Sequence, residues 1–194
     1  LGDMGCHIFN AMYRGLGLTA PKRVRSSTAV PNQHNWTNNE RVEYDFPATA
    51  YTGGGLKVFW VSGSQRAPKE LTNLVPKGVK YRFGCLLKGE KGLLLLRHGN
   101  SPVLLPVEKF AGVTPNKLET IGHHDAFIES VLDGDQSRLL SSIDYAAPMT
   151  EFILLGNIAM QYSPNWLEWD AKQARIPNHK DANKHIHRSY RSGW

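Results

Sequence analysis

Cysteine is scarce in this sequence. Its 194 residues include two, Cys6 and Cys85, which are far apart and belong to no Cys-x-x-Cys pair. A disulfide framework or a cysteine-rich zinc site needs more thiols at closer spacing. We therefore expect two free, buried thiols, and the cysteine count leaves the redox compartment undetermined.

Long apolar runs and concentrated charge are also missing. No apolar run is long enough to span a bilayer and no signal peptide is present, so we predict no membrane partner. The net charge of +6 is modest, and no basic stripe carries interleaved aromatic residues, so we predict no nucleic-acid partner. The same charge would suit a basic pocket for an anionic cofactor or substrate.

The composition is that of a folded domain. Hydrophobic residues make up 41% of the chain and charged residues 21%, which is enough apolar side chain to build a core. The length fits one domain over 1–194, and the 5 Trp, 7 Tyr and 7 Phe favour a packed sheet over a helical bundle.

Hydrophobic periodicity predicts an α+β fold with an open, mostly antiparallel (mixed) sheet and helices packed on one face. Pro148 is expected in the first turn of its helix and Gly134 at a helix end. We expect aromatic side chains on the uncovered face to favour a second subunit packing there, which would make a homo-oligomer. The predicted helices are 3–18, 118–132, 142–161 and 181–191, and the predicted strands are 22–30, 41–46, 56–61, 80–87, 92–97, 102–105 and 166–176.

Asp3 and His7 form the most informative pair in the chain. They are four residues apart where a helix begins, so both can lie on one helix face. A carboxylate beside an imidazole fixes its tautomer and raises its basicity, which suits the imidazole to take a proton from a substrate hydroxyl. Two structural alternatives are open: Asp3 as a helix N-cap, and His7 as an ordinary, partly buried histidine.

Three other patterns give weaker indications. Gly15–Ala20 matches Gly-x-Gly-x-x-Ala, but a dinucleotide site needs a strand before this motif and a helix after it. The histidines near the C-terminus are loosely spaced and have no cysteine beside them, so we predict no metal. His124 stands at a predicted helix start, from which it could reach a cleft.

Several segments together resemble the glucose–fructose oxidoreductase and inositol dehydrogenase (Gfo/Idh/MocA) family, over nearly the whole chain. The resemblance is to a bacterial branch whose members are often exported, which leaves the location open between cytoplasm and periplasm. The segments are Gly2–Asn10, Tyr44–Ala48, Lys88–Gly92, Gly122–Phe127, Asp144–Ala159, Trp169–Asp170 and Tyr190–Trp194.

The resemblance implies the C-terminal substrate domain of a two-domain enzyme. An N-terminal Rossmann domain that binds NAD or NADP, and a lysine that it contributes, would lie outside this chain, and the fragment alone would be inactive. By position His7 and Asp3 would be catalytic in hydride transfer from a sugar or polyol hydroxyl. Asn10, where the family has Asp, and His124 would bind substrate.

Two further functions fit the same residues. Some family members cleave glycosides without net redox change, by oxidising and then re-reducing the sugar. A non-catalytic domain for dimerisation or binding is the other alternative. The sequence does not name the sugar or the direction of the reaction.

Overall fold

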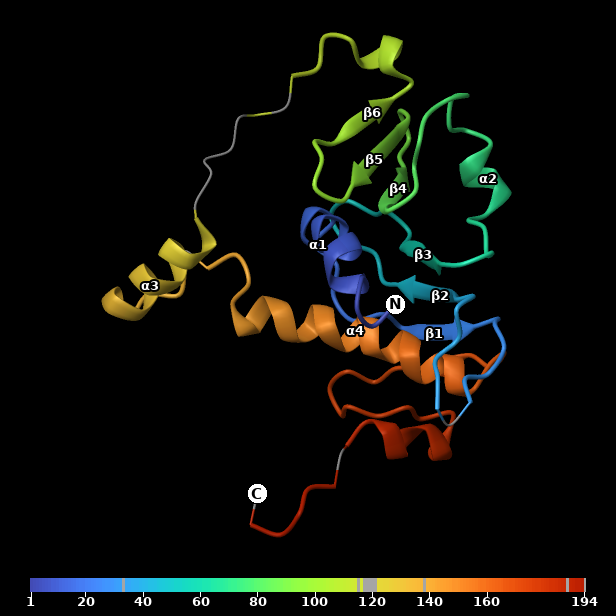
Figure 1. Cartoon of the computed structure of the whole chain (residues 1–194), viewed down its shortest axis with the longest axis vertical. Helices are drawn as coiled ribbons and strands as arrows, with labels where there is room; N and C mark the ends of the chain where they lie inside the picture. Colours follow the sequence, from blue (N-terminus) through green and yellow to red (C-terminus); the bar gives the residue numbers. More distant parts are fainter. Residues whose placement is uncertain (33, 115, 117–121, 138, 188, 194) are drawn as a thin grey trace.

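The chain folds into helices and two open antiparallel sheets, an α+β arrangement (Figure 1). The structure is a computed structural model of residues 1–194, and it describes 1–32, 34–114, 116, 122–137, 139–187 and 189–193. The fold class predicted from the sequence is confirmed. Every strand pairing in the described residues is antiparallel, so these strands do not form the mixed sheet that we allowed for.

The first sheet has the strand order β3-β2-β1-β7. The alternation of apolar and polar residues determines which face of this sheet is buried, because successive side chains of a strand point to opposite sides. In β2 the residues Val42, Tyr44 and Phe46 are buried, while the residues between them face outward. The strands are β1 (Arg23–Ser26), β2 (Arg41–Phe46), β3 (Leu56–Val61) and β7 (Leu167–Glu168).

The uncovered face of this sheet is mainly charged. Arg23 pairs with Asp45 at 2.6 Å and Arg25 with Glu43 at 2.6 Å, across the register that joins β1 to β2. Both guanidinium groups also lie over the ring of Trp166, 4.2 and 4.5 Å from its centroid. A second subunit on this face would therefore meet an ion-pair ladder more than the aromatic surface that we expected.

The second sheet has the order β4-β5-β6 and buries apolar side chains on both faces. Leu96 in β5 packs toward the main core, together with Cys85 and Leu87. Leu93 and Leu95 face the other way and form a small core with Leu105. The four consecutive leucines of β5 are explained by this double burial. The strands are β4 (Gly84–Lys88), β5 (Leu93–Arg97) and β6 (Val103–Leu105).

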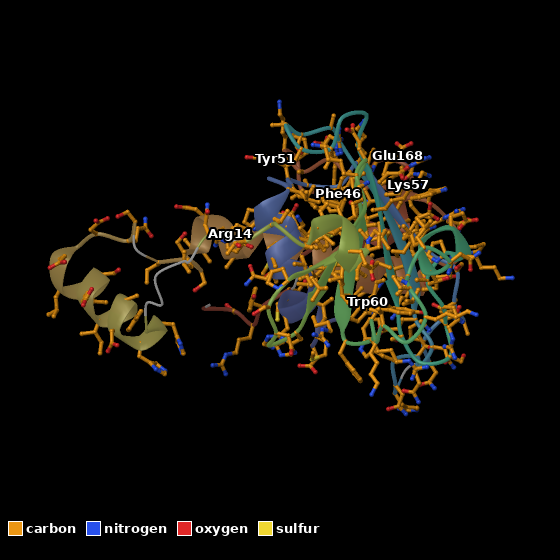
Figure 2. All side chains as sticks on the ribbon, turned by 90° about the horizontal axis from the view of Figure 1, so that it is seen from above. Arg14, Phe46, Tyr51, Lys57, Trp60 and Glu168 are labelled. Atoms are coloured by element: carbon orange, nitrogen blue, oxygen red, sulfur yellow. The ribbon has the colours of Figure 1, made fainter. Side chains whose placement is uncertain are left out.

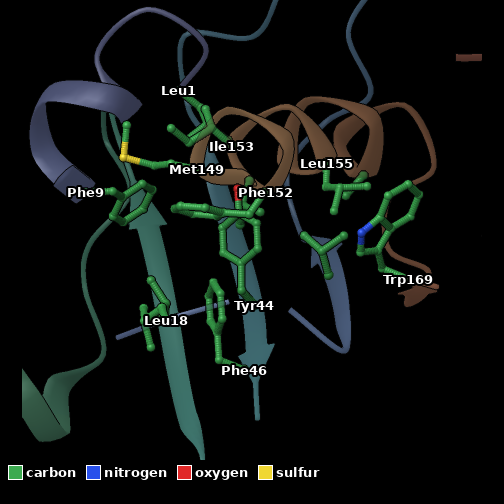
Figure 3. Packing of buried hydrophobic residues seen from close by; sticks show 14 of the residues in the cluster. Leu1, Phe9, Leu18, Tyr44, Phe46, Met149, Phe152, Ile153, Leu155 and Trp169 are labelled. Carbon is green, nitrogen blue, oxygen red and sulfur yellow. The ribbon is translucent and has the colours of Figure 1, made fainter. Parts of the chain in front are cut away.

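Two helices organise the main core. Helix α4 (Ile143–Gln161) runs across β1 and β2, and α1 (Gly5–Gly15) packs against α4 and against the second sheet. Aromatic rings fill the space between helix and sheet. Phe152 of α4 stacks on Tyr13 at a centroid distance of 5.2 Å, and it meets Tyr44 edge-on at 5.5 Å (Figure 3).

Helix α3 (His123–Asp133) stands apart from the sheets (Figure 1). Its large apolar side chains are exposed, with Leu132 at 78%. It ends at Gly134, whose φ of 67° is the left-handed conformation that we predicted for a C-terminal glycine. The predicted start of this helix, residues 118–121, lies outside the described residues. The remaining helical segments are α2 (Lys69–Thr72) and the 3₁₀ helices η1 (Val107–Phe110) and η2 (Lys180–His185).

Three local predictions were wrong. Pro148 lies in the interior of α4, well past the first turn, where it withholds one backbone donor from the helix. The segment 166–176 contains the two-residue strand β7 and an isolated bridge between Asp170 and Arg175, and not one long strand. The helix predicted over 181–191 is a 3₁₀ helix over Lys180–His185, and the Asn183 side chain donates to the backbone oxygens of His179 and Lys180 at its start.

Candidate functional site

The site predicted from the sequence lies along the exposed side of α1. Gly5, Phe9 and Met12 are buried at helical spacing, so the positions between them form the opposite stripe. The stripe is made by Asp3, His7, Asn10 and Arg14, which are all exposed. The structure thus brings three of the four predicted site residues, Asp3, His7 and Asn10, to one surface.

Asp3 precedes the helix and does not cap it. The N-cap residue of α1 is Met4, and its side chain makes no capping hydrogen bond. The Asp3 backbone oxygen accepts a hydrogen bond from Cys6 Sγ at 3.4 Å. Neither a hydrogen bond nor an ion pair joins Asp3 to His7 in the described part of the chain. The orientation of His7 by a carboxylate is therefore still a prediction.

His7 has another imidazole beside it. The ring of His98, which directly follows β5, lies 5.2 Å from that of His7 at an interplanar angle of 52°. Both residues are exposed, so the interpretation of His7 as a partly buried histidine does not hold. Two imidazoles from segments more than ninety residues apart in the sequence thus lie side by side at the surface.

Asn10 is held by a residue of α4. The hydroxyl of Tyr145 donates to Asn10 Oδ1 at 2.5 Å and lies 3.1 Å from its backbone oxygen. The Arg14 guanidinium lies 3.8 Å from the centroid of the Tyr145 ring and also donates to the backbone oxygen of Leu140. Partial burial raises the pKa of Tyr145, against the lowering effect of Arg14, so its hydroxyl keeps the proton that it donates to Asn10. The amide of Asn10 is thereby fixed with its NH₂ group left to donate.

His124 is placed elsewhere. It lies in the first turn of α3, exposed, with its ring 4.0 Å from that of His123. Among the described residues no hydrogen bond or ring contact connects it to the α1 stripe. Figure 2 shows Arg14 on the side of the body that faces α3, and Lys57 and Glu168 on the opposite side.

The Gly15–Ala20 segment does not have the geometry of a dinucleotide-binding motif. The Gly15–Ala20 motif follows a helix and leads into β1, with Gly17 at a φ of 57°, so no helix N-terminus lies behind it to receive a pyrophosphate. A group of three metal-binding side chains is not found in the described part of the chain. Among the described residues, no helix combines the length and the apolar character needed to cross a membrane.

His98 and Tyr145 are the site residues that the sequence analysis missed. His98 follows a strand and carries no motif, so only the packing of α1 on the second sheet brings it to His7. Tyr145 lies within a segment that we used for the resemblance, and its link to Asn10 spans 135 residues. A search of the sequence for polar residues near helix and strand ends could have suggested His98 as a candidate site residue, but it would not have shown that His98 lies beside His7.

Other segments behind the resemblance have structural roles here. Glu151 accepts a hydrogen bond from the indole of Trp169 at 2.8 Å, which ties α4 to the chain after β7. Gly156 gives room to the Tyr44 ring, because a Cβ at this position would overlap its hydroxyl. Glu151 and Gly156 therefore have roles in packing, and these contacts give them no role in binding or catalysis.

Comparison with known proteins identifies no relative: no protein-family model matches the chain, and no curated protein matches its sequence. The resemblance to sugar oxidoreductases therefore remains a prediction made from the motifs.

Proposed function

We propose that this chain is the substrate-binding part of an NAD(P)-dependent oxidoreductase that acts on a hydroxyl of a sugar or polyol. The observation that carries the proposal is the exposed stripe of α1, where His7, Asp3 and Asn10 share one solvent-facing surface. A sugar presents several hydroxyls at once, and such a row of donors and acceptors matches it.

In this proposal the residues handle binding and a proton. His7 takes the proton of the reacting hydroxyl, since an exposed imidazole within reach of substrate is the usual general base near neutral pH. Asp3 accepts from a neighbouring hydroxyl, and the amide of Asn10, positioned by Tyr145, donates to another. The proton transfer is the only chemical step that we assign to this chain. The nicotinamide would be held by residues outside it.

The direct test measures turnover in a protein that joins this chain to the nucleotide-binding domain that the proposal requires. NADH or NADPH formation is followed with a panel of sugars and polyols. Replacing His7 by Gln should lower kcat by about 10²–10⁴-fold, the usual contribution of a general base, while KM changes little.

The matched control replaces His34, an exposed histidine of the 31–40 loop, by Gln, and should leave kcat unchanged. Equal turnover of the His7 variant and the parent would remove His7 from the mechanism. This chain alone should form no reduced cofactor, but saturable NMR shifts on α1 in the presence of a sugar would still report binding.

The alternatives give different results in the same assays. Glycoside cleavage at a catalytic amount of NAD, without net NADH, would indicate the redox-neutral reaction.

We also propose a homo-oligomer through the uncovered face of the first sheet. Sedimentation of the chain as a strict monomer at high concentration would contradict that interface and leave both reactions standing.

A further inference from the structure

The second sheet carries an arginine where its pattern calls for another apolar residue. Leu93, Leu95 and Arg97 alternate along β5 and lie on the same face. The two leucines are almost fully buried in the small core with Leu105. Arg97 thus extends a row of buried leucines, on the face turned away from the main core.

A cavity of about 340 Å³ lies on this face. Its volume is in the range of small-molecule sites, and no acidic side chain lines it. The lining combines an aliphatic wall with two cations: Val79, Leu95, Val103 and Leu105 form the wall, and Lys80 and Arg97 supply the charge.

One nitrogen of the Arg97 guanidinium has no hydrogen-bond partner among the described residues. This nitrogen, Nε, is buried. In the described part of the chain, no ion pair involves Arg97 or Lys80, although other arginines pair with carboxylates across the first sheet. A buried donor without an acceptor is unfavourable. The Arg97 side chain also lines the cavity, so an anion bound there would lie beside its guanidinium.

We propose that this cavity binds a small organic anion, with its oxyanion head group on Arg97 and Lys80 and an aliphatic body on the valine and leucine wall. A guanidinium binds carboxylate and phosphate oxygens through paired, charge-assisted hydrogen bonds. The site is separate from the α1 stripe and does not depend on the function proposed for that stripe.

The probes are hexanoate and hexyl phosphate, titrated into the ¹⁵N-labelled chain at low ionic strength and followed by NMR. Saturable shifts are expected at residues 78–80, 95–97 and 103–107 for at least one probe, and the stronger probe identifies the head group. Hexanol lacks the charge and inorganic phosphate lacks the aliphatic body, so each should bind at least about tenfold more weakly.

The variants test the two cations separately. Arg97→Gln should weaken the stronger probe at least tenfold, and Lys80→Gln should weaken it less, because Lys80 is exposed. The controls Arg82→Gln and Lys77→Gln remove exposed cations of the same segment that do not line the cavity, and they should leave affinity within twofold. If Arg97→Gln fails to fold, the affinities of Arg97→Lys and Lys80→Gln are measured instead.

Three results would overturn the proposal: no saturable shift with either probe at millimolar concentration, shifts confined to other residues, or equal affinity in the folded Arg97 and Lys80 variants and in the parent. Equal binding of hexanol and hexanoate would also do so, because it would show an apolar cavity without anion recognition.

Discussion

Cys85 is buried between the second sheet and the main core. Burial raises the pKa of its thiol from 9.0 to about 12, because the thiolate cannot be solvated there. The folded protein therefore keeps this proton to much higher pH than the unfolded chain does. Below pH 9 both states hold the proton and the thiol has no effect on the pH dependence of stability.

From pH 9 to 12 the unfolded chain releases the Cys85 proton while the folded protein retains it. The unfolding free energy should fall across this range by roughly 1.4 kcal/mol per pH unit at most for this group. Tyr13 and Tyr44, whose pKa values burial also raises, add their own losses above pH 10. Urea unfolding between pH 8 and 10 measures the effect.

Cys85→Ala should flatten the profile between pH 9 and 10, whatever it does to stability at pH 7. Cys6→Ala, on α1 and only half-buried, is the control and should leave the slope as it was. A slope unchanged by Cys85→Ala would show that this thiol does not titrate differently in the two states.

The sequence predicted residues well where one local rule decided their environment. Two isolated cysteines implied free, buried thiols. Both are free and Cys85 is buried, but Cys6 is only partly buried. His98 and Arg97 illustrate the opposite case, because their significance comes from a neighbour or a cavity made by distant segments. No periodicity or motif encodes such a juxtaposition, so the sequence alone could not identify them.

At the scale of elements, the crossing of α1 and α4 depends on Gly5. A Cβ at this position would lie 2.9 Å from Ile153 Cγ2 and 3.3 Å from Leu1 Cδ1, so the helices would have to separate. Gly5→Ala should lower the unfolding free energy by about 1–3 kcal/mol, the usual cost of overpacking, as measured by chemical denaturation.

Gly15→Ala is the matched control, because the same substitution at the end of α1 meets nothing within 4 Å. It should be neutral or should stabilise the protein by about 0.4–1 kcal/mol, since alanine restricts the unfolded chain. Equal effects of the two substitutions would mean that helix propensity and not the α1–α4 contact decides the outcome.

The elements that the sequence predicted best are β2 and β3, whose bounds match the expected 41–46 and 56–61. Period-two alternation fixes a strand when one face is buried and the other is charged. The chain after residue 166 gave no such signal. This segment is held by asparagine side chains that hydrogen-bond to the backbone. Asn178 bonds to Glu168 and Trp166, and Asn183 bonds to Ile176. Such bonds produce no periodic pattern of apolar residues in the sequence.

At the scale of the whole molecule, the described residues form two apolar cores of very different size. The main core joins α1, α4 and the first sheet, and it includes the fully buried Val24, Val42 and Tyr44. Figure 3 shows Tyr44 within it. The small core beneath the outer face of the second sheet has three buried residues, Leu93, Leu95 and Leu105. Less buried apolar surface gives less resistance to local opening.

We therefore expect the second sheet to open without global unfolding. Native-state hydrogen exchange at increasing denaturant should give a lower opening free energy for amides of β5 and β6 than for those of β2. Leu95→Ala should speed exchange in β5 and β6 much more than in β2, because the cavity that it leaves lies in the small core. Leu155→Ala, in the main core, should instead speed exchange in both sheets. Identical opening free energies for the two sheets would contradict this expectation. They would show that both cores unfold as one cooperative unit, which is the strictest meaning of a single domain over 1–194.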